Sequence, residues 1–135
     1  MKRILVVSDH RISVDLLRDE LARQSLEQDL EVFLLCSLPG SAVRNLVRRK
    51  RFWSARHAEL HADLDELMSM GVLSDGLVAI TDPLDSVHKT LWALRPEQVI
   101  VVSARSGRYE DGCRRALALY GVESERQLET TWLST

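Results

Sequence analysis

The stretch "PEQVIVVSARSGRYEDG", residues 96–112, decides the fold, because it joins a strand to the start of a helix. Its four β-branched residues at 99–102 predict a strand that is covered on both faces. Small and basic residues follow at once. A helix is then predicted over residues 110–120, with Gly121 as its C-cap. In open α/β sheets this kind of junction is where phosphate groups bind.

Short apolar runs alternate with helical periodicity on either side of this stretch. Further strands are predicted at 4–7, 31–36 and 77–80, with a final edge strand at 127–133. Strands that alternate with helices need right-handed crossovers. The sequence therefore predicts one domain over residues 1–135, with an α/β, Rossmann-like fold and an open, mainly parallel five-stranded sheet between two helical layers.

The predicted helices lie between these strands and each carries an apolar stripe. The first spans residues 13–28, and the second ends at Gly71. The third has Asp82 as N-cap and Pro83 at its first position, and Pro96 stops it. The residues expected to face the core are Trp53, His57, Leu60, Leu64, Leu67 and Met68 in the second helix, Leu84, Val87, Leu91 and Leu94 in the third, and Cys113, Ala116 and Leu117 in the fourth.

Composition limits the classes of function. Eighteen basic residues against 20 acidic ones leave a formal charge of −2, which argues against general attraction to nucleic acid or anionic membranes. The N-terminus "MKRILVVSDH" has too short an apolar run for a secretion signal, and no segment is long enough to span a bilayer. Cys36 and Cys113 lack CxxC spacing, so we expect reduced, packed cysteines in a cytoplasmic protein.

Four segments together resemble the universal stress protein family over nearly the whole chain. They are "RILVVSD" at 3–9, "LEVFLLCSLPG" at 30–40, "ITDPLDSVHKTLWAL" at 80–94 and "EQVIVVSARSG" at 97–107. The resemblance implies the strand order 3-2-1-4-5 and frequent homodimers. In some members it also implies ATP bound between the first and fourth strands.

The sequence departs from the family where the phosphates would be held. ATP-binding members carry Gly-x2-Gly-x9-Gly-Ser/Thr after the fourth strand, because glycines let backbone N–H groups approach the phosphates. Here the motif begins at Ala104 and keeps Gly107, but nine residues later the chain has Leu117 and Ala118. Asp9 matches the family's acidic residue that faces the nucleoside. It could equally be a solvated or helix-capping aspartate.

The candidate ligand residues offer one carboxylate together with hydroxyls, guanidinium groups and backbone donors. They are Asp9, Ser103, Arg105, Ser106, Gly107 and Arg108. The expected ligand is ATP or another adenine nucleotide, with binding that is weak or lost. The alternative is an ordinary surface loop.

A second basic cluster surrounds Phe52 and Trp53. Its members are Arg44, Arg48, Arg49, Lys50, Arg51 and Arg56, which could meet an acidic protein or a phosphate-bearing ligand. The alternative is a solvated helix face whose arginine stems cover apolar surface. His57 and His61 lie one helical turn apart, but no cysteine or carboxylate pattern completes a metal site, so none is predicted.

The sequence carries no recognised catalytic signature, and the protein is predicted not to be an enzyme. The leading hypothesis is a non-catalytic module that binds a nucleotide weakly or has become a protein-interaction module, and the broken glycine motif favours the second. It is expected to form a homodimer through the final strand, where Leu128 and Trp132 would otherwise be exposed. The alternatives are an ATP-binding sensor that uses Asp9 and the loop 103–108, and a nucleotide-dependent enzyme of the same α/β group. A signalling receiver fits poorly, because Cys36 stands where the phosphoacceptor carboxylate would be and one βα unit is missing.

Overall fold

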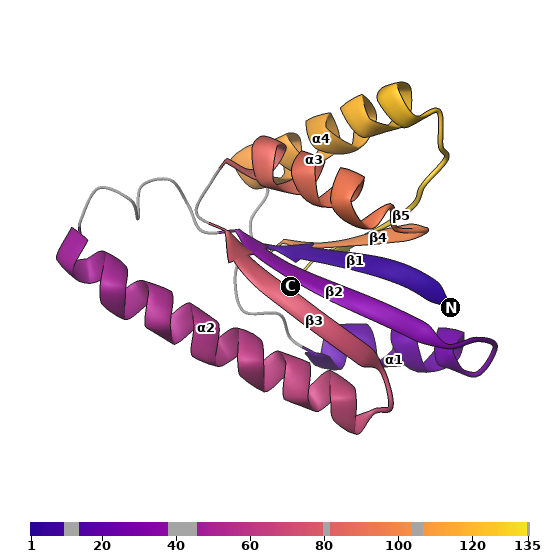
Figure 1. Cartoon of the computed structure of the whole chain (residues 1–135), viewed down its shortest axis with the longest axis horizontal. Helices are drawn as coiled ribbons and strands as arrows, with labels where there is room; N and C mark the ends of the chain where they lie inside the picture. The colour runs from indigo at the N-terminus through magenta and orange to yellow at the C-terminus, as the bar shows by residue number, and fades with distance from the viewer. Residues whose placement is uncertain (10–13, 38–45, 80–81, 104–106, 135) are drawn as a thin grey trace.

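The computed structural model describes residues 1–9, 14–37, 46–79, 82–103 and 107–134 (Figure 1). These residues form five strands and four helices. In chain order the elements are β1 (Lys2–Ser8), α1 (Val14–Ser25), β2 (Leu30–Ser37), α2 (Leu46–Ser69), β3 (Leu73–Ala79), α3 (Pro83–Leu94), β4 (Gln98–Ser103), α4 (Arg108–Ser124) and β5 (Glu129–Ser134).

The strands form one sheet in the order β3-β2-β1-β4-β5. Every neighbouring pair is parallel, so the predicted α/β architecture is confirmed and the sheet is wholly parallel. This order differs from the 2-1-3-4-5 order of signalling receivers, which removes that alternative.

Two helices cover each face of the sheet. Figure 1 shows α1 and α2 on one side and α3 and α4 on the other. Alternate residues of each strand supply the two cores, as the period of a strand requires. In β1, Ile4 and Val6 pack with α1 and α2, whereas Leu5 and Val7 pack with α3 and α4. Both faces of β1 and β4 are therefore buried, which explains their continuous apolar runs.

The third strand begins earlier than predicted. β3 starts at Leu73, four residues before the predicted start at 77, and Ile80 lies outside the described residues. Aspartate and glycine are uncommon in strands, so the sequence around Asp75 and Gly76 does not predict the first half of β3. Gly76 is required there, since a Cβ atom would lie 2.9 Å from the carbonyl oxygen of Leu34 and from a methyl group of Leu60. The close approach of β2 and α2 thus explains why a glycine stands within β3.

The fourth helix is longer than predicted at both ends, and the prediction of Gly121 as its C-cap is wrong. The helix continues to Ser124, and Glu125 takes the left-handed C-cap conformation with φ of 56°. Tyr120 is fully buried and packs edge-on against Trp92, with ring centroids 5.1 Å apart. This contact holds the end of the helix, and it outweighs the low helix propensity of Gly121.

The ends of α2 and α3 agree with the sequence. Gly71 has φ of 81° and the N–H group of Val72 donates to the carbonyl oxygen of Leu67, as in a Schellman C-cap. Asp82 caps α3 by accepting a hydrogen bond of 2.8 Å from the N–H group of Leu84. The assignment of Met68 to the apolar stripe of α2 is wrong, because its side chain is 60% exposed.

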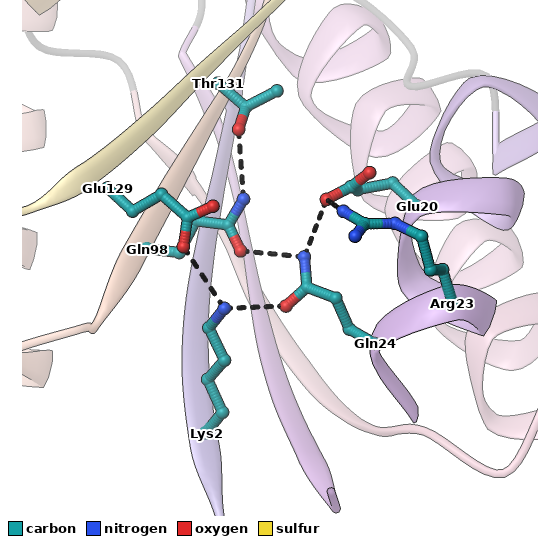
Figure 2. Close-up of polar contacts among 7 residues, drawn as sticks. All are labelled: Lys2, Glu20, Arg23, Gln24, Gln98, Glu129 and Thr131. Carbon is teal, nitrogen blue, oxygen red and sulfur yellow. Dashed lines mark hydrogen bonds and ion pairs between the residues drawn. The ribbon is translucent and has the colours of Figure 1, made fainter. Parts of the chain in front are cut away.

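A polar network ties the amino ends of the strands together (Figure 2). We call it the amino-edge network; its members are Lys2, Glu20, Arg23, Gln24, Gln98, Glu129 and Thr131. Gln98 is fully buried in β4, accepts from Gln24 at 2.9 Å and donates to Thr131 of β5 at 3.0 Å. Lys2 donates to Gln24 at 2.7 Å and to Glu129 at 3.3 Å. These contacts fasten β5 to β4, β1 and α1.

Candidate functional site

The strand order reverses between β1 and β4, which lie side by side with Ser8 opposite Val102. The connections from these two strands leave in opposite directions, and ligands of open α/β sheets bind outside the carboxyl ends at such a point. Asp9 follows β1 directly and is partly buried. Ser103 ends β4 and is 3% exposed. Two of the six predicted residues therefore lie at the edge where a ligand is expected.

The N-terminus of α4 lies just beyond β4. Gly107 is the N-cap residue, with φ of 108° and no side-chain hydrogen bond to the helix. The first N–H groups of a helix have no partner within it, and they attract anions together with the helix dipole. Glu110 and Asp111 in the first turn already place negative charge there. The start of α4 thus offers N–H donors to an anion, but the charges of these two side chains weaken the attraction.

The position of the third glycine in the ATP-binding motif lies within a helix of this chain. Because α4 begins at Arg108, Leu117 and Ala118 lie within it, at the place where the third glycine of the motif would stand. Backbone N–H groups in the middle of a helix are bonded to carbonyl groups one turn earlier. They therefore cannot approach a phosphate, whereas the N–H groups at the start of α4 can.

The starts of α3 and α4 lie against each other. A Cβ atom on Gly112 would lie 3.1 Å from Cβ of Pro83 and 3.3 Å from the nitrogen of Leu84. Only glycine fits this contact without a shift of α3. The contact sets the position of the first turn of α4 relative to the sheet edge.

Tyr109 and two thiols lie close enough to Asp9 for its charge to act on them. Tyr109 is 8% exposed and its hydroxyl group lies beside the Cys113 thiol, one helical turn further on. Burial, together with Cys113 and the Asp9 carboxylate, holds the pKa of Tyr109 well above its usual value of 10.0. Asp9 therefore acts on groups at both faces of the sheet, because Cys36 packs with α1 and α2 whereas Tyr109 and Cys113 belong to α4.

The two cysteines are not activated. Burial raises the pKa of Cys36 to about 11 and that of Cys113 to about 12, and the Asp9 carboxylate adds to both shifts. Arg56 opposes the shift of Cys36, and the Tyr109 hydroxyl opposes that of Cys113. A nucleophilic cysteine needs a lowered pKa, so neither thiol has the electrostatic setting of a catalytic one.

Several predicted ligand residues are only partly described. Arg105 and Ser106 lie outside the described residues, and Arg108 is described in its backbone alone. In the second basic cluster, Arg56 has a described side chain. It is 18% exposed and forms an ion pair of 3.1 Å with Glu59 of the same helix. Arg56 thus contacts its own helix, and the side chains of the other five basic residues lie outside the described part of the chain.

Within the described residues, no three side chains of His, Cys, Asp or Glu gather as a metal site would need. No described helix has both the length and the apolar character that crossing a membrane would need.

Sequence reasoning missed Tyr109 and the amino-edge network. Tyr109 follows the loop glycine by two positions, so an aromatic residue at a helix start was the available signal. Gln98 was visible as a polar residue directly before the apolar run of β4. Neither signal shows which side chains Tyr109 and Gln98 contact in the folded chain.

No family model matches the sequence, and no curated protein matches it significantly. Solved structures are similar over nearly the whole chain. The hypothetical protein MJ0577 is 11% identical, with a TM-score of 0.70 over 99% of this chain and 96% of its own. A universal stress protein of Archaeoglobus fulgidus is 14% identical, with a TM-score of 0.64 over 98% of this chain and 93% of its own. A structure of the universal stress protein from Archaeoglobus fulgidus in complex with dAMP is 12% identical, with a TM-score of 0.59 over 98% of this chain and 96% of its own. The universal stress protein family protein At3g01520 of Arabidopsis thaliana, with AMP bound, is 15% identical, with a TM-score of 0.58 over 98% of this chain and 92% of its own.

Proposed function

Because this chain has the fold of the universal stress proteins, we propose that it is a non-catalytic module that binds an adenine nucleotide weakly. One observation carries the proposal: Asp9 and the start of α4 flank the point where the strand order reverses. The similar structures from Archaeoglobus fulgidus and Arabidopsis thaliana contain dAMP and AMP. The proposed site lies at the carboxyl edge of β1 and β4.

The six predicted residues divide between the two ends of the nucleotide. Asp9 would accept hydrogen bonds from the nucleoside. Ser103, Gly107 and Arg108 would hold the phosphates with Arg105 and Ser106, through hydroxyl, backbone and guanidinium donors. Binding is expected to be weak, because Leu117 and Ala118 of α4 stand where the motif has its third glycine and because Glu110 and Asp111 repel an anion.

The absence of catalysis is part of the proposal. The two thiols with raised pKa values support it, since neither Cys36 nor Cys113 has the setting of a nucleophile. A nucleotide-dependent enzyme is the alternative. ATP turnover by the purified protein that Asp9→Ala abolishes would establish the alternative in its place.

We propose a cytoplasmic location because neither described cysteine forms a disulfide. Cys36 and Cys113 are buried as reduced thiols. Reduced cysteines without a disulfide framework are typical of reducing compartments.

We propose a homodimer because one edge of β5 is unpaired among the described strands. Among the described strands, β5 pairs with β4 alone, so its other edge is unpaired. Trp132 is 36% exposed on this strand, and the Arg114 guanidinium covers its ring at 4.1 Å from the centroid. Leu128 is less exposed than expected, because it lies before β5 and packs against the core of α3 and α4. A parallel edge strand with an exposed aromatic residue favours pairing with a second copy.

Isothermal titration with AMP, ATP and cyclic AMP tests the nucleotide proposal. We expect saturable binding that Asp9→Ala weakens about tenfold or more, since a hydrogen bond to a charged group is lost. Asp29→Ala is the matched control, because it removes an exposed carboxylate at the opposite edge of the sheet. Heats that are the same for protein and buffer at millimolar nucleotide would disprove the proposal.

A further inference from the structure

Tyr109 has a buried hydroxyl group at the start of α4. The side chain is 8% exposed, and its hydroxyl finds no hydrogen-bond partner of suitable geometry among the described residues. The Cys113 thiol lies beside it, but sulfur is a weak acceptor. A buried polar group without a partner lowers stability, and phenylalanine would avoid that loss at the same position. Because Tyr109 lies at the start of α4, next to the proposed nucleotide site, its hydroxyl is available to a ligand there.

The surroundings of this hydroxyl favour a neutral ligand group. The carboxylate of Asp9 is close enough to raise the pKa of Tyr109 further, beyond the larger effects of burial and of Cys113. The hydroxyl thus stays protonated and is a hydrogen-bond donor at physiological pH. A phosphate group placed beside Asp9 would be repelled, whereas a ribose hydroxyl or a ring nitrogen would not.

We propose that the Tyr109 hydroxyl donates a hydrogen bond to the nucleoside part of the bound nucleotide, beside Asp9. Asp9 supplies an acceptor and Tyr109 supplies a donor, so together they match the mixed donor and acceptor groups of a nucleoside. The phosphates then lie towards Gly107, where the N–H groups of the first turn of α4 begin. This inference rests on the proposed nucleotide site and assigns a contact within it.

Tyr109→Phe tests the contact, with Tyr120→Phe as its matched control. Tyr120 is on the same helix, is fully buried, and also has a hydroxyl without a partner among the described residues. It lies at the other end of α4, far from Gly107 in the chain. The two variants therefore lose the same group in similar surroundings, one at the site and one away from it.

Titrations with AMP and with adenosine give the first result. We expect Tyr109→Phe to weaken both ligands by the same factor, about three- to tenfold, because one neutral hydrogen bond is lost. Tyr120→Phe should bind both as the wild type does. Unchanged AMP binding by Tyr109→Phe would overturn the contact, as would a loss for AMP that adenosine does not share.

Thermal unfolding without ligand gives the second result. If the hydroxyl serves the ligand alone, Tyr109→Phe should have a Tm equal to or above that of the wild type. A Tm several degrees lower would show a structural role and overturn the inference.

The two proposals fail separately: a wild-type protein that binds neither AMP nor adenosine contradicts the nucleotide site and this contact with it. Binding that Asp9→Ala weakens and Tyr109→Phe does not contradicts the contact alone.

Discussion

Cys36 and Cys113 lie in the cores on opposite faces of the sheet, and both thiols are held neutral by burial. Their usual pKa is 9.0, and the folded values are about 11 and about 12. The folded state therefore holds these protons more tightly than the unfolded state does. The stability that this provides is complete below about pH 9 and is lost as the pH rises through the folded values.

We expect the free energy of unfolding to fall between about pH 9 and pH 11, and to fall less in the double variant Cys36→Ala with Cys113→Ala. Urea unfolding at a series of pH values measures both slopes. Tyr109 also has a raised pKa, so the double variant should keep part of the decline. Identical slopes in the two proteins would contradict the assignment of the decline to the thiols.

At the scale of single elements, β3 has an edge that is protected by one side chain. The Asp75 carboxylate accepts a hydrogen bond of 2.8 Å from the N–H group of Gly76. Asp75 stands between two exposed leucines, Leu73 at 58% and Leu77 at 49%. Charged residues on an edge strand oppose pairing with another chain, and here the carboxylate also occupies a backbone donor.

Asp75→Val should open this edge to association. The variant strand would carry three apolar residues in alternation and no charge, which is typical of strands that aggregate. We expect light scattering to show particles that grow with protein concentration. Asp85→Val is the control, because it removes an exposed carboxylate from α3 and leaves the sheet edge intact. A variant with the wild-type size at every concentration would refute the protective role.

Most elements could be predicted because their signals are local. The apolar run of β4 and the Asp82 and Pro83 pair need only neighbouring residues to be recognised. The start of β3 could not be predicted because Asp75 and Gly76 are residue types uncommon in strands, and the end of α4 could not because Tyr120 contacts Trp92 from a distant segment. The sequence likewise indicated Asp9 but not Tyr109, because only the fold shows that the Tyr109 hydroxyl is buried without a hydrogen-bond partner among the described residues.

At the scale of the whole molecule, the sheet has two different edges. On β3, the charged side chain of Asp75 opposes pairing with another chain. On β5, Trp132 is partly exposed, and the charge of Glu129 is neutralised by an ion pair with Lys2. This asymmetry favours one interface between two copies over growth at both edges.

Sedimentation equilibrium tests the dimer. We expect the wild type to have twice the mass of the chain, and Trp132→Ser to shift the equilibrium towards the monomer, because apolar contact area is lost from the interface. Leu73→Ser is the control, since Leu73 is 58% exposed on β3, at the other edge of the sheet. A wild-type monomer at high concentration, unchanged by Trp132→Ser, would rule out this interface.

The pairing of β1 with β4 also has a kinetic consequence. Val6 lies opposite Ile100, so the centre of the sheet joins segments from distant parts of the sequence. Contacts of such long range slow folding, because the loops between them must close before pairing stabilises the chain. The edge that carries Asp9 and Ser103 is therefore absent from any partly folded intermediate in which β1 and β4 have not yet met. Ligand binding during refolding would then follow the slowest phase, and it would report when the sheet is complete.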